Sequence, residues 1–242
     1  MGKCRNIVAR KVPLSAHEYN VAMAVPGEHH PAFEEYCETI FELREDDLDV
    51  IQARIADRLR VSRPSVSEMI KRMSDESLIE VAGGKITLTA SGEELAVRVV
   101  RRHRIAERFI TDILGLSWSL AHREAGRWEH VMSHEVETAM SRLLGEPTTC
   151  PHGNPIPGSG YTPPSAKKLS ELSSGQEFTV SRIPEELEFT PGMLEFLEKS
   201  HLVPGSHGTV QTGANADGMT VLIDGTSVTV DSFATVRILV TV

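Results

Sequence analysis

Cysteine and long apolar runs are both scarce in this sequence of 242 residues. The three cysteines, Cys4, Cys37 and Cys150, are odd in number and far apart, so they predict no disulfide framework. No apolar stretch approaches the roughly 20 residues that a helix needs to cross a bilayer. The N-terminus is basic but lacks the apolar segment of a secretory signal. These absences argue against a membrane protein and predict a cytoplasmic one.

An excess of positive charge is also missing. The chain has 25 Lys and Arg residues against 34 Asp and Glu residues, which gives a net charge of -9 and argues against a protein that coats nucleic acid. Affinity for DNA nevertheless depends on local contacts with phosphate. Residues 52–73 contain only two acidic residues among the basic residues Arg54, Arg58, Arg60, Arg63, Lys71 and Arg72. This local excess suggests a DNA-binding segment, although a solvated helix face has a similar composition.

Motifs typical of enzymes are absent from the sequence. It contains no nucleophile elbow, no phosphate-binding loop and no dinucleotide-binding fingerprint. The run HEVET, which starts at His134, lacks the second histidine of a zinc hydrolase motif. We therefore expect a protein that is not an enzyme.

Residues 31–92 are predicted to form a winged helix-turn-helix. Pro31 suits the first turn of a helix, and a second helix is expected over about residues 51–59. Ser62 is a good N-cap for a third helix, which has Pro64 in its first turn. The β-rich runs LIEVA and KITLT are joined by Gly83-Gly84, which predicts a hairpin.

The other regions differ in composition from this part. Residues 1–30 show no sustained period and predict a poorly ordered extension. Residues 93–146 predict a helical domain with a core, a dimer interface or both, and with one helix from about Ser119 to Leu144. Residues 147–165 are rich in Pro and Gly and predict a linker, whereas the short β-rich runs of residues 166–242 predict an SH3-like β-barrel. The expected fold class is mostly α with β.

Two helical stripes in the helical domain combine imidazole with carboxylate. His103 and Glu107 lie four residues apart, so both side chains face the same way. The second stripe consists of His122, Gly126, Glu129 and His130. A lone histidine or an i,i+4 pair is usually a surface feature, but two stripes on neighbouring helices suit a borderline divalent metal such as Fe²⁺ or Mn²⁺.

Five runs of the sequence together resemble the diphtheria toxin repressor family, also called iron-dependent regulators. They are EEYCETIFEL, RIADRLRVSRPSVSEMIKRM, RRHRIAERFITDILGL, EAGRWEHVMS and PHGNPIPG. The resemblance covers residues 31–242. It implies a winged helix, a helical metal-binding and dimerisation domain, and an SH3-like domain of the FeoA kind. It also implies that bound metal orders the N-terminal helix and fits a dimer to a palindromic operator.

The resemblance implies two metal sites in each subunit. The ancillary site would use His103, Glu107 and His122, together with Glu185 and Glu188 from the run RIPEELEF. The other interpretation of that run is an acidic surface loop.

The primary site would use Glu129 and His130, and here the sequence departs from the family pattern. Glu35 and Gly126 stand where the iron-sensing branch has a Met and a Cys, so Gly126 would offer only its backbone carbonyl. Glu35 and Glu38 are similar to an acidic pair in the manganese-sensing branch, which however has an acidic residue at the position of Gly126. Glu38 could equally lie on a solvated helix face. The metal is thus either Fe²⁺ or Mn²⁺, and carboxylate ligands favour Mn²⁺.

The third helix, residues 62–73, is predicted to enter the major groove of DNA. At its N-terminal end, the residues expected to face the base edges are Ser62, Arg63, Pro64, Ser65, Ser67 and Glu68. The residues expected to contact phosphate are Arg54, Arg60 and Arg72, with Lys85 near the wing.

The expected function is therefore a metal-dependent transcriptional repressor that binds double-stranded DNA as a homodimer, with one or two dimers on each operator. Protons compete with metal for imidazole, so activation should weaken below about pH 6.5. An alternative is a metal-buffering or transport-accessory protein whose SH3-like domain binds partners, in which PIPGSGYTPP is an internal ligand. A metal hydrolase is a third possibility, which an esterase assay would test.

Overall fold

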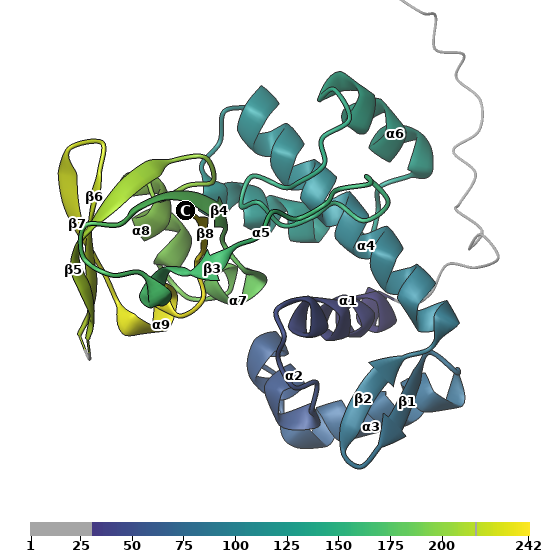
Figure 1. Cartoon of the computed structure of the whole chain (residues 1–242). Coiled ribbons are helices and arrows are strands. Elements are labelled where there is room, and N and C mark those ends of the chain that lie inside the picture. The colour runs from purple at the N-terminus through teal and green to yellow at the C-terminus, as the bar shows by residue number, and fades with distance from the viewer. Residues whose placement is uncertain (1–30, 216) are drawn as a thin grey trace, which may run out of the picture. The chain divides into compact units, whose positions relative to one another are not determined.

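The computed structural model describes residues 31–215 and 217–242 (Figure 1). The extension predicted for residues 1–30 lies outside this part of the chain. The first described elements are α1 (Pro31–Glu45), α2 (Gln52–Leu59), α3 (Arg63–Asp75), β1 (Ile79–Ala82) and β2 (Lys85–Leu88). Their order confirms the predicted winged helix-turn-helix.

Local chemistry explains both the turn between α2 and α3 and the hairpin. Arg60 ends α2 in the left-handed conformation, with φ of 54°. The Ser62 hydroxyl then caps α3 by accepting a hydrogen bond from the backbone N–H of Ser65 at 3.2 Å. Gly83 and Gly84 have φ of 58° and 81°, so the two-residue turn between β1 and β2 uses backbone conformations that glycine adopts without strain.

The helical part consists of α4 (Ala90–Arg108), a π-helical turn (Phe109–Ile113), α5 (Trp118–Trp128) and α6 (His134–Leu143). The single helix expected from about Ser119 to Leu144 is therefore wrong. The Ser133 hydroxyl starts α6 as a new helix by accepting a hydrogen bond from the backbone N–H of Val136 at 3.3 Å. The acidic residues in the first turn of α6 suit a helix N-terminus. α1 and α5 both pack against α4.

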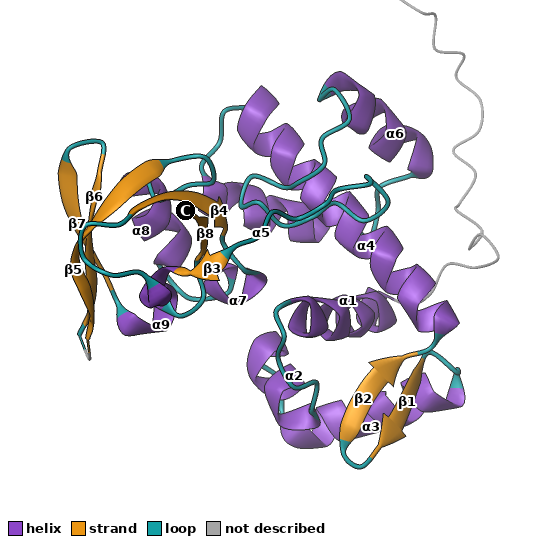
Figure 2. Cartoon of the chain, in the orientation of Figure 1, coloured by secondary structure: helices purple, strands orange, loops and turns teal. Residues whose placement is uncertain are grey.

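The C-terminal part contains a six-stranded antiparallel sheet with the order β3-β8-β4-β5-β6-β7 (Figure 2). The strands are β3 (Lys167–Lys168), β4 (Glu177–Arg182), β5 (His207–Asn215), β6 (Gly218–Ile223), β7 (Thr226–Val230) and β8 (Leu239–Thr241). The helices of this part are the 3-10 turn Leu169–Glu171, α7 (Glu185–Glu188), α8 (Met193–Lys199) and α9 (Ser232–Thr235). The sheet and its turns enclose a separate hydrophobic core, to which Trp118 of α5 also belongs.

The segment between α6 and β3 contains a buried turn. The Cys150 N–H donates a hydrogen bond to the carbonyl of Asn154 at 2.9 Å, and the Gly153 N–H donates to the carbonyl of Cys150 at 3.0 Å. The carbonyl of His152 accepts from the N–H of Ile183 at 2.8 Å, which fixes the turn against the end of β4. Composition alone suggested a linker here.

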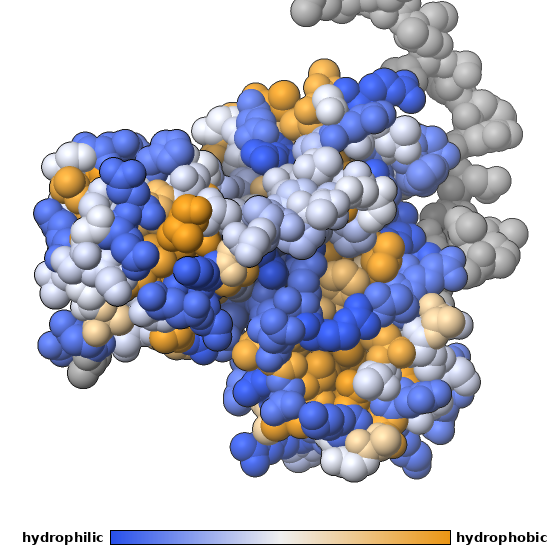
Figure 3. All heavy atoms as spheres, in the orientation of Figure 1, coloured by the Kyte–Doolittle hydropathy of each residue, from blue (hydrophilic) through white to orange (hydrophobic). Residues whose placement is uncertain are grey.

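Hydrophobic residues are visible over the winged-helix part on the face drawn in Figure 3. Several hydrophobic residues of this part are only partly buried, among them Phe41, Leu48 and Val50. A domain of this size buries a limited fraction of its surface, so some apolar exposure is expected. In residues 31–215 and 217–242, no helix combines the length and the apolar character needed to cross a membrane.

Candidate metal centre

One cluster joins α1 to the residues that follow α5. The two ring nitrogens of His130 face two carboxylates of α1: Nδ1 lies 2.7 Å from Glu34 Oε2, and Nε2 lies 3.0 Å from Glu35 Oε1. Glu129 Oε1 lies 3.2 Å from His130 Nε2. The ligand atoms of Glu35, Glu129 and His130 thus lie within 4.8 Å of one another, as coordination of one ion requires. Glu34 was not predicted for this cluster.

Glu38 lies one turn further along α1 and completes a neighbouring group. It is 7% exposed, so its interpretation as a residue on a solvated helix face is wrong. Its Oε1 lies 3.9 Å from His103 Nδ1, which is also in hydrogen-bond contact with Glu129. His103 therefore lies between the groups at α1 and those deeper in the helical part.

Gly126 contributes no side chain to any of these groups. A Cβ atom built at Gly126 would meet nothing within 4 Å, so a side chain at this position has open space around it. The predicted role of Gly126 is therefore limited to its backbone carbonyl.

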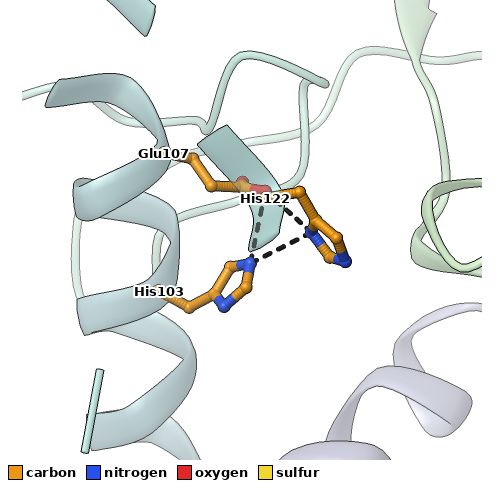
Figure 4. A group of neighbouring side chains, drawn as sticks. All are labelled: His103, Glu107 and His122. Atoms are coloured by element: carbon orange, nitrogen blue, oxygen red, sulfur yellow. Dashed lines mark hydrogen bonds and ion pairs between the residues drawn. The ribbon is translucent and has the colours of Figure 1, made fainter. Parts of the chain in front are cut away.

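The predicted ancillary residues of α4 and α5 face one another (Figure 4). Glu107 Oε1 lies 3.2 Å from His103 Nε2 and 3.0 Å from His122 Nδ1. The two imidazole nitrogens lie 3.3 Å apart. Atoms at these spacings fit around a cation that binds nitrogen and oxygen at about 2.0–2.2 Å.

The α7 carboxylates of Glu185 and Glu188 lie close to His122 of the same cluster, and they are 0% and 5% exposed. The alternative of an acidic surface loop is therefore wrong. Glu188 Oε2 lies 3.3 Å from His122 Nδ1. Glu185 Oε1 is held by Arg104, with its Nη2 at 2.9 Å, so Glu185 is close to the cluster but already has a cationic partner.

Two further residues of this cluster, Cys150 and His152, were missed at the level of sequence. His152 Nδ1 lies 2.8 Å from Glu188 Oε2 and 3.5 Å from Glu107 Oε2. Cys150 Sγ lies 3.8 Å from His152 Nδ1, and both residues are 0% exposed. The Cys-x-His spacing within a Pro- and Gly-rich segment was the available signal, but the composition of that segment suggested a linker.

The carboxylates hold the imidazoles in their charged form. Hydrogen bonds that His130 donates to Glu34 and Glu35 raise its pKa to about 10, against the opposing effect of burial. Burial lowers the pKa of His122, but hydrogen bonds with Glu107 and Glu188 outweigh it and raise the pKa to about 9. A metal ion that binds these nitrogens must displace those protons.

Burial has the opposite effect on the acidic groups. Burial and the nearby charge of Glu129 raise the pKa of Glu38 well above its usual value. Burial and the charge of Glu188 raise the pKa of Glu185 to about 7, although Arg104 lowers it. The cluster thus gathers more acidic groups than its imidazoles neutralise.

Several buried carboxylate oxygens of these residues make no hydrogen bond, although three of them lie near an imidazole nitrogen, and such oxygens fit a bound cation. Four buried carboxylate oxygens have no hydrogen-bond partner among the described residues: Glu38 Oε1, Glu107 Oε2, Glu185 Oε2 and Glu188 Oε2. Buried polar atoms without partners are rare in native proteins, and a cation satisfies carboxylate oxygens directly.

The residues predicted to contact DNA are mostly exposed. On α3, the apolar residues Val66, Ile70 and Met73 are buried, whereas the exposed set comprises Ser62, Arg63, Pro64, Ser65, Ser67, Glu68 and Arg72. Arg60 is exposed in the turn. Arg54 and Lys85 both contact Asp49, through its carbonyl at 3.1 Å and its carboxylate at 3.3 Å.

Family models match three regions of the chain. Residues 30–85 match the N-terminal DNA-binding domain of iron-dependent repressors, and residues 89–158 match their metal-binding and dimerisation domain. Residues 167–242 match the FeoA domain. The fold, the ligand clusters and these matches define a metal-responsive DNA-binding protein.

Similar proteins agree with this class. The iron-dependent repressor IdeR of Mycobacterium tuberculosis is 38% identical over 204 residues, which are 79% of this chain and 88% of that protein. The diphtheria toxin repressor of Corynebacterium jeikeium is 48% identical over 126 residues, 52% of each chain. The solved structure of T. acidophilum IdeR has a TM-score of 0.71 at 32% identity, and covers 86% of this chain and 97% of that one. A manganese-dependent transcriptional repressor in complex with manganese has a TM-score of 0.77 at 31% identity, and covers 86% and 99%. The chain belongs to the iron-dependent repressor family.

Proposed function

We propose that this chain is a cytoplasmic transcriptional repressor that depends on Fe²⁺ or Mn²⁺ and binds a palindromic operator as a homodimer. The observation that carries this proposal is the meeting of Glu35 from α1 with Glu129 and His130 from the helical part. A cation at this place would link the DNA-binding part to the part that binds metal. The family is one of regulators, so we propose no catalytic activity.

We propose two sets of ligands, each for one ion. The primary set is Glu35, Glu38, Glu129 and His130 with the carbonyl of Gly126. The ancillary set is His103, Glu107, His122 and Glu188, with Glu185 nearby. A bound divalent cation would supply the positive charge that offsets the carboxylates within each set. The primary set offers no sulfur atom, which favours Mn²⁺ over softer ions.

The position of α1 determines the position of the DNA-reading helix. Tyr36 and Ile40 of α1 belong to the same hydrophobic core as Ile55 of α2 and Val66 of α3. Because these helices share one core, a change in how α1 docks also moves α3. Without metal, only the proton on His130 offsets the repulsion between Glu35 and Glu129, whereas a divalent cation supplies two charges, so metal shifts the population toward the docked form.

Exposed apolar side chains of the helical part support the proposed homodimer. Val131 is 81% exposed and Leu143 is 64% exposed, and the same region also exposes Ile113, Leu114 and Val136. Because residues 89–158 match a metal-binding and dimerisation domain, exposed apolar side chains in this part are candidates for the dimer interface. We also propose that the domains span residues 31–92, 93–146 and 166–242, with a linker at 147–165. One or two dimers would bind each operator.

Fluorescence anisotropy tests the proposal. The DNA probe is an operator selected from a random pool by the manganese-loaded protein, and binding is measured with Mn²⁺, Fe²⁺, Zn²⁺ and no metal. His130→Ala should lose the metal stimulation while it stays a folded dimer. His134→Ala is the matched control, because His134 is exposed and lies outside every candidate cluster. Equal DNA binding by the metal-loaded and metal-free native chain would refute the proposal.

A further inference from the structure

Phe189 directly follows Glu188, a residue of the proposed ancillary set, and lies at the end of α7. Its backbone N–H donates a hydrogen bond to the carbonyl of Glu185 at 3.2 Å, so its backbone moves with α7. Its ring packs edge-to-face on the ring of His122, with centroids 5.1 Å apart and planes at 87°. Two residues of the ancillary set, Glu188 and His122, therefore determine where this ring lies.

The same aromatic ring contacts the winged-helix part. The Arg58 guanidinium of α2 lies over the ring of Phe189, with its Cζ 4.4 Å from the ring centroid. The Arg58 side chain is 4% exposed, and a cation–π contact is stronger when the cation is removed from water. Arg58 Nη2 has no hydrogen-bond partner among the described residues, and the electron-rich face of the ring can take that role. Phe189 thus joins the ancillary set to α2.

Arg58 is in turn connected to α1 and α3. Its Nη1 donates a hydrogen bond to Glu42 Oε2 of α1 at 3.1 Å. It lies in the last turn of α2, and α3 begins at Arg63 after a short turn. Because α1, α2 and α3 share one hydrophobic core, a shift of Arg58 also moves the helix that is predicted to enter the major groove.

Open space lies beside this contact. A cavity of about 510 Å³ is lined by residues of α2, of α5 and of the segment from α7 to α8, among them Arg58, His122 and Phe189. Phe189 itself is 38% exposed. Because neighbouring atoms do not enclose its ring, the position of the ring depends on His122 on one side and on Arg58 on the other.

We propose that Phe189 is a positioning residue that transmits metal binding at the ancillary set to the winged-helix part through Arg58. This inference rests on the proposed function, because it couples the second set of ligands to operator binding. A cation bound by Glu188 and His122 would fix the ring of Phe189, and the ring would then hold Arg58 in the docked position. Metal at the ancillary set thereby strengthens DNA binding, although Phe189 itself binds neither metal nor DNA.

A double-mutant cycle of operator binding tests this inference at saturating Mn²⁺. Phe189→Leu keeps an apolar side chain but removes the ring face, so we expect operator affinity to fall about threefold to tenfold, as for the loss of a desolvated cation–π contact. Glu107→Gln weakens the ancillary set from α4. In a chain with Glu107→Gln, adding Phe189→Leu should have no further effect, because no ancillary ion is left to transmit. Phe189→Tyr keeps the ring and should keep native affinity.

Phe233→Leu is the matched control. Phe233 is also 38% exposed, and its ring also contacts an arginine, with Arg237 Cζ 3.7 Å from the centroid. Both residues lie in the C-terminal part and belong to no candidate metal cluster. This variant should bind the operator as the native chain does.

Calorimetry without DNA adds a readout that separates transmission from damage to the metal site. Phe189→Leu should bind Mn²⁺ with native stoichiometry and affinity, whereas Glu107→Gln should lose one equivalent. A loss of Mn²⁺ affinity in Phe189→Leu, native operator affinity in that variant, or an equal loss of operator affinity with and without Glu107→Gln would overturn the inference. If metal still stimulates operator binding by the native chain, only the role of Phe189 fails. If native operator binding ignores metal, the proposed function fails with it.

Discussion

Gly126 lies one helical turn before Glu129 and His130, with open space around the place where a side chain would be. Gly126→Cys should add a sulfur ligand to the primary set without a clash. We expect affinity for Co²⁺ or Zn²⁺ to rise at least about tenfold, equivalent to about 1.4 kcal/mol, while affinity for Mn²⁺ changes little. Competition with a chelating indicator measures both.

Gly126→Ala is the control for this variant, because replacing glycine within a helix stabilises the helix by about 1 kcal/mol even when no ligand is added. If the Ala and Cys variants gain the same affinity, the gain comes from the helix and the position provides no ligand.

Arg104 has no exposed surface and connects three parts of the fold. Its guanidinium donates to Glu45 of α1 at 2.7 Å and to Glu185 of α7 at 2.9 Å, from its own place on α4. Arg104→Ala would leave the buried carboxylate of Glu185 without its cation, whereas Glu45 would keep Arg182 at 3.1 Å. We expect it to lower the free energy of unfolding by about 3–5 kcal/mol, as urea denaturation would measure.

Arg44 provides the comparison for Arg104. It also pairs with a carboxylate, Glu93 at 2.7 Å, but the two side chains are 51% and 37% exposed. Arg44→Ala should cost less than about 1 kcal/mol, because solvent screens the pair. Similar losses in the two variants would show that burial of the Arg104 network contributes nothing to stability.

At the scale of elements, α3 and the hairpin of β1 and β2 make different contacts in the proposed DNA complex. Arg63 begins α3 and is exposed, so Arg63→Ala should weaken operator binding by about 1–3 kcal/mol and relax sequence preference. Lys85→Ala should weaken binding to all sequences alike and reduce the salt slope by about one counterion. Anisotropy over a range of salt concentrations separates the two.

Calorimetric titration of metal checks that this division of roles is correct. Neither Arg63 nor Lys85 belongs to a candidate metal cluster, so both variants should bind metal as the native chain does. A fall in metal affinity that matches the fall in DNA affinity would contradict the assignment of these residues to DNA.

Helical period predicted α1, α2 and α3 because each has its own core face, and Pro31 and Ser62 marked the starts of α1 and α3, whereas α2 begins without a side-chain cap. The same approach missed the break before α6, where Ser133 and two acidic residues form a helix start within a continuous apolar pattern. It also missed Cys150 and His152. Their burial results from contacts with residues far apart in sequence, such as Ile183 and Glu188, and local composition carries no record of such contacts.

The sequence predicted that the residues of the proposed ancillary set lie close together, but it did not predict their surroundings. Spacing placed His103, Glu107 and His122 on facing helices, and the structure brings them together. Spacing could not show that Arg104 already holds Glu185, nor that His103 contacts Glu129 through its other nitrogen. These contacts depend on how α4, α5 and α7 pack against one another. The contact between His103 and Glu129 joins the two proposed sets of ligands.

At the scale of the whole molecule, a proton and a metal ion compete for His130, the residue that contacts α1. In the absence of metal, His130 carries a proton between Glu34 and Glu35, and these contacts raise its pKa to about 10. A raised pKa means that the proton stabilises this contact fully below the usual value of about 6.5. That stabilisation is lost as pH rises through about 10. Metal requires the neutral ring, so metal binding strengthens over the same interval.

Apparent metal affinity should therefore keep rising above the pH of about 6.5 that a free imidazole predicts. Between about pH 6.5 and about pH 8.5 we expect up to a tenfold gain for each pH unit and each displaced proton. Calorimetry in buffers of different ionisation enthalpy counts the protons released. His130→Gln should release fewer protons and flatten the slope, whereas His134→Ala should leave both unchanged. An affinity that is constant above about pH 7 in the native chain would show that the carboxylates of α1 do not hold the proton on His130.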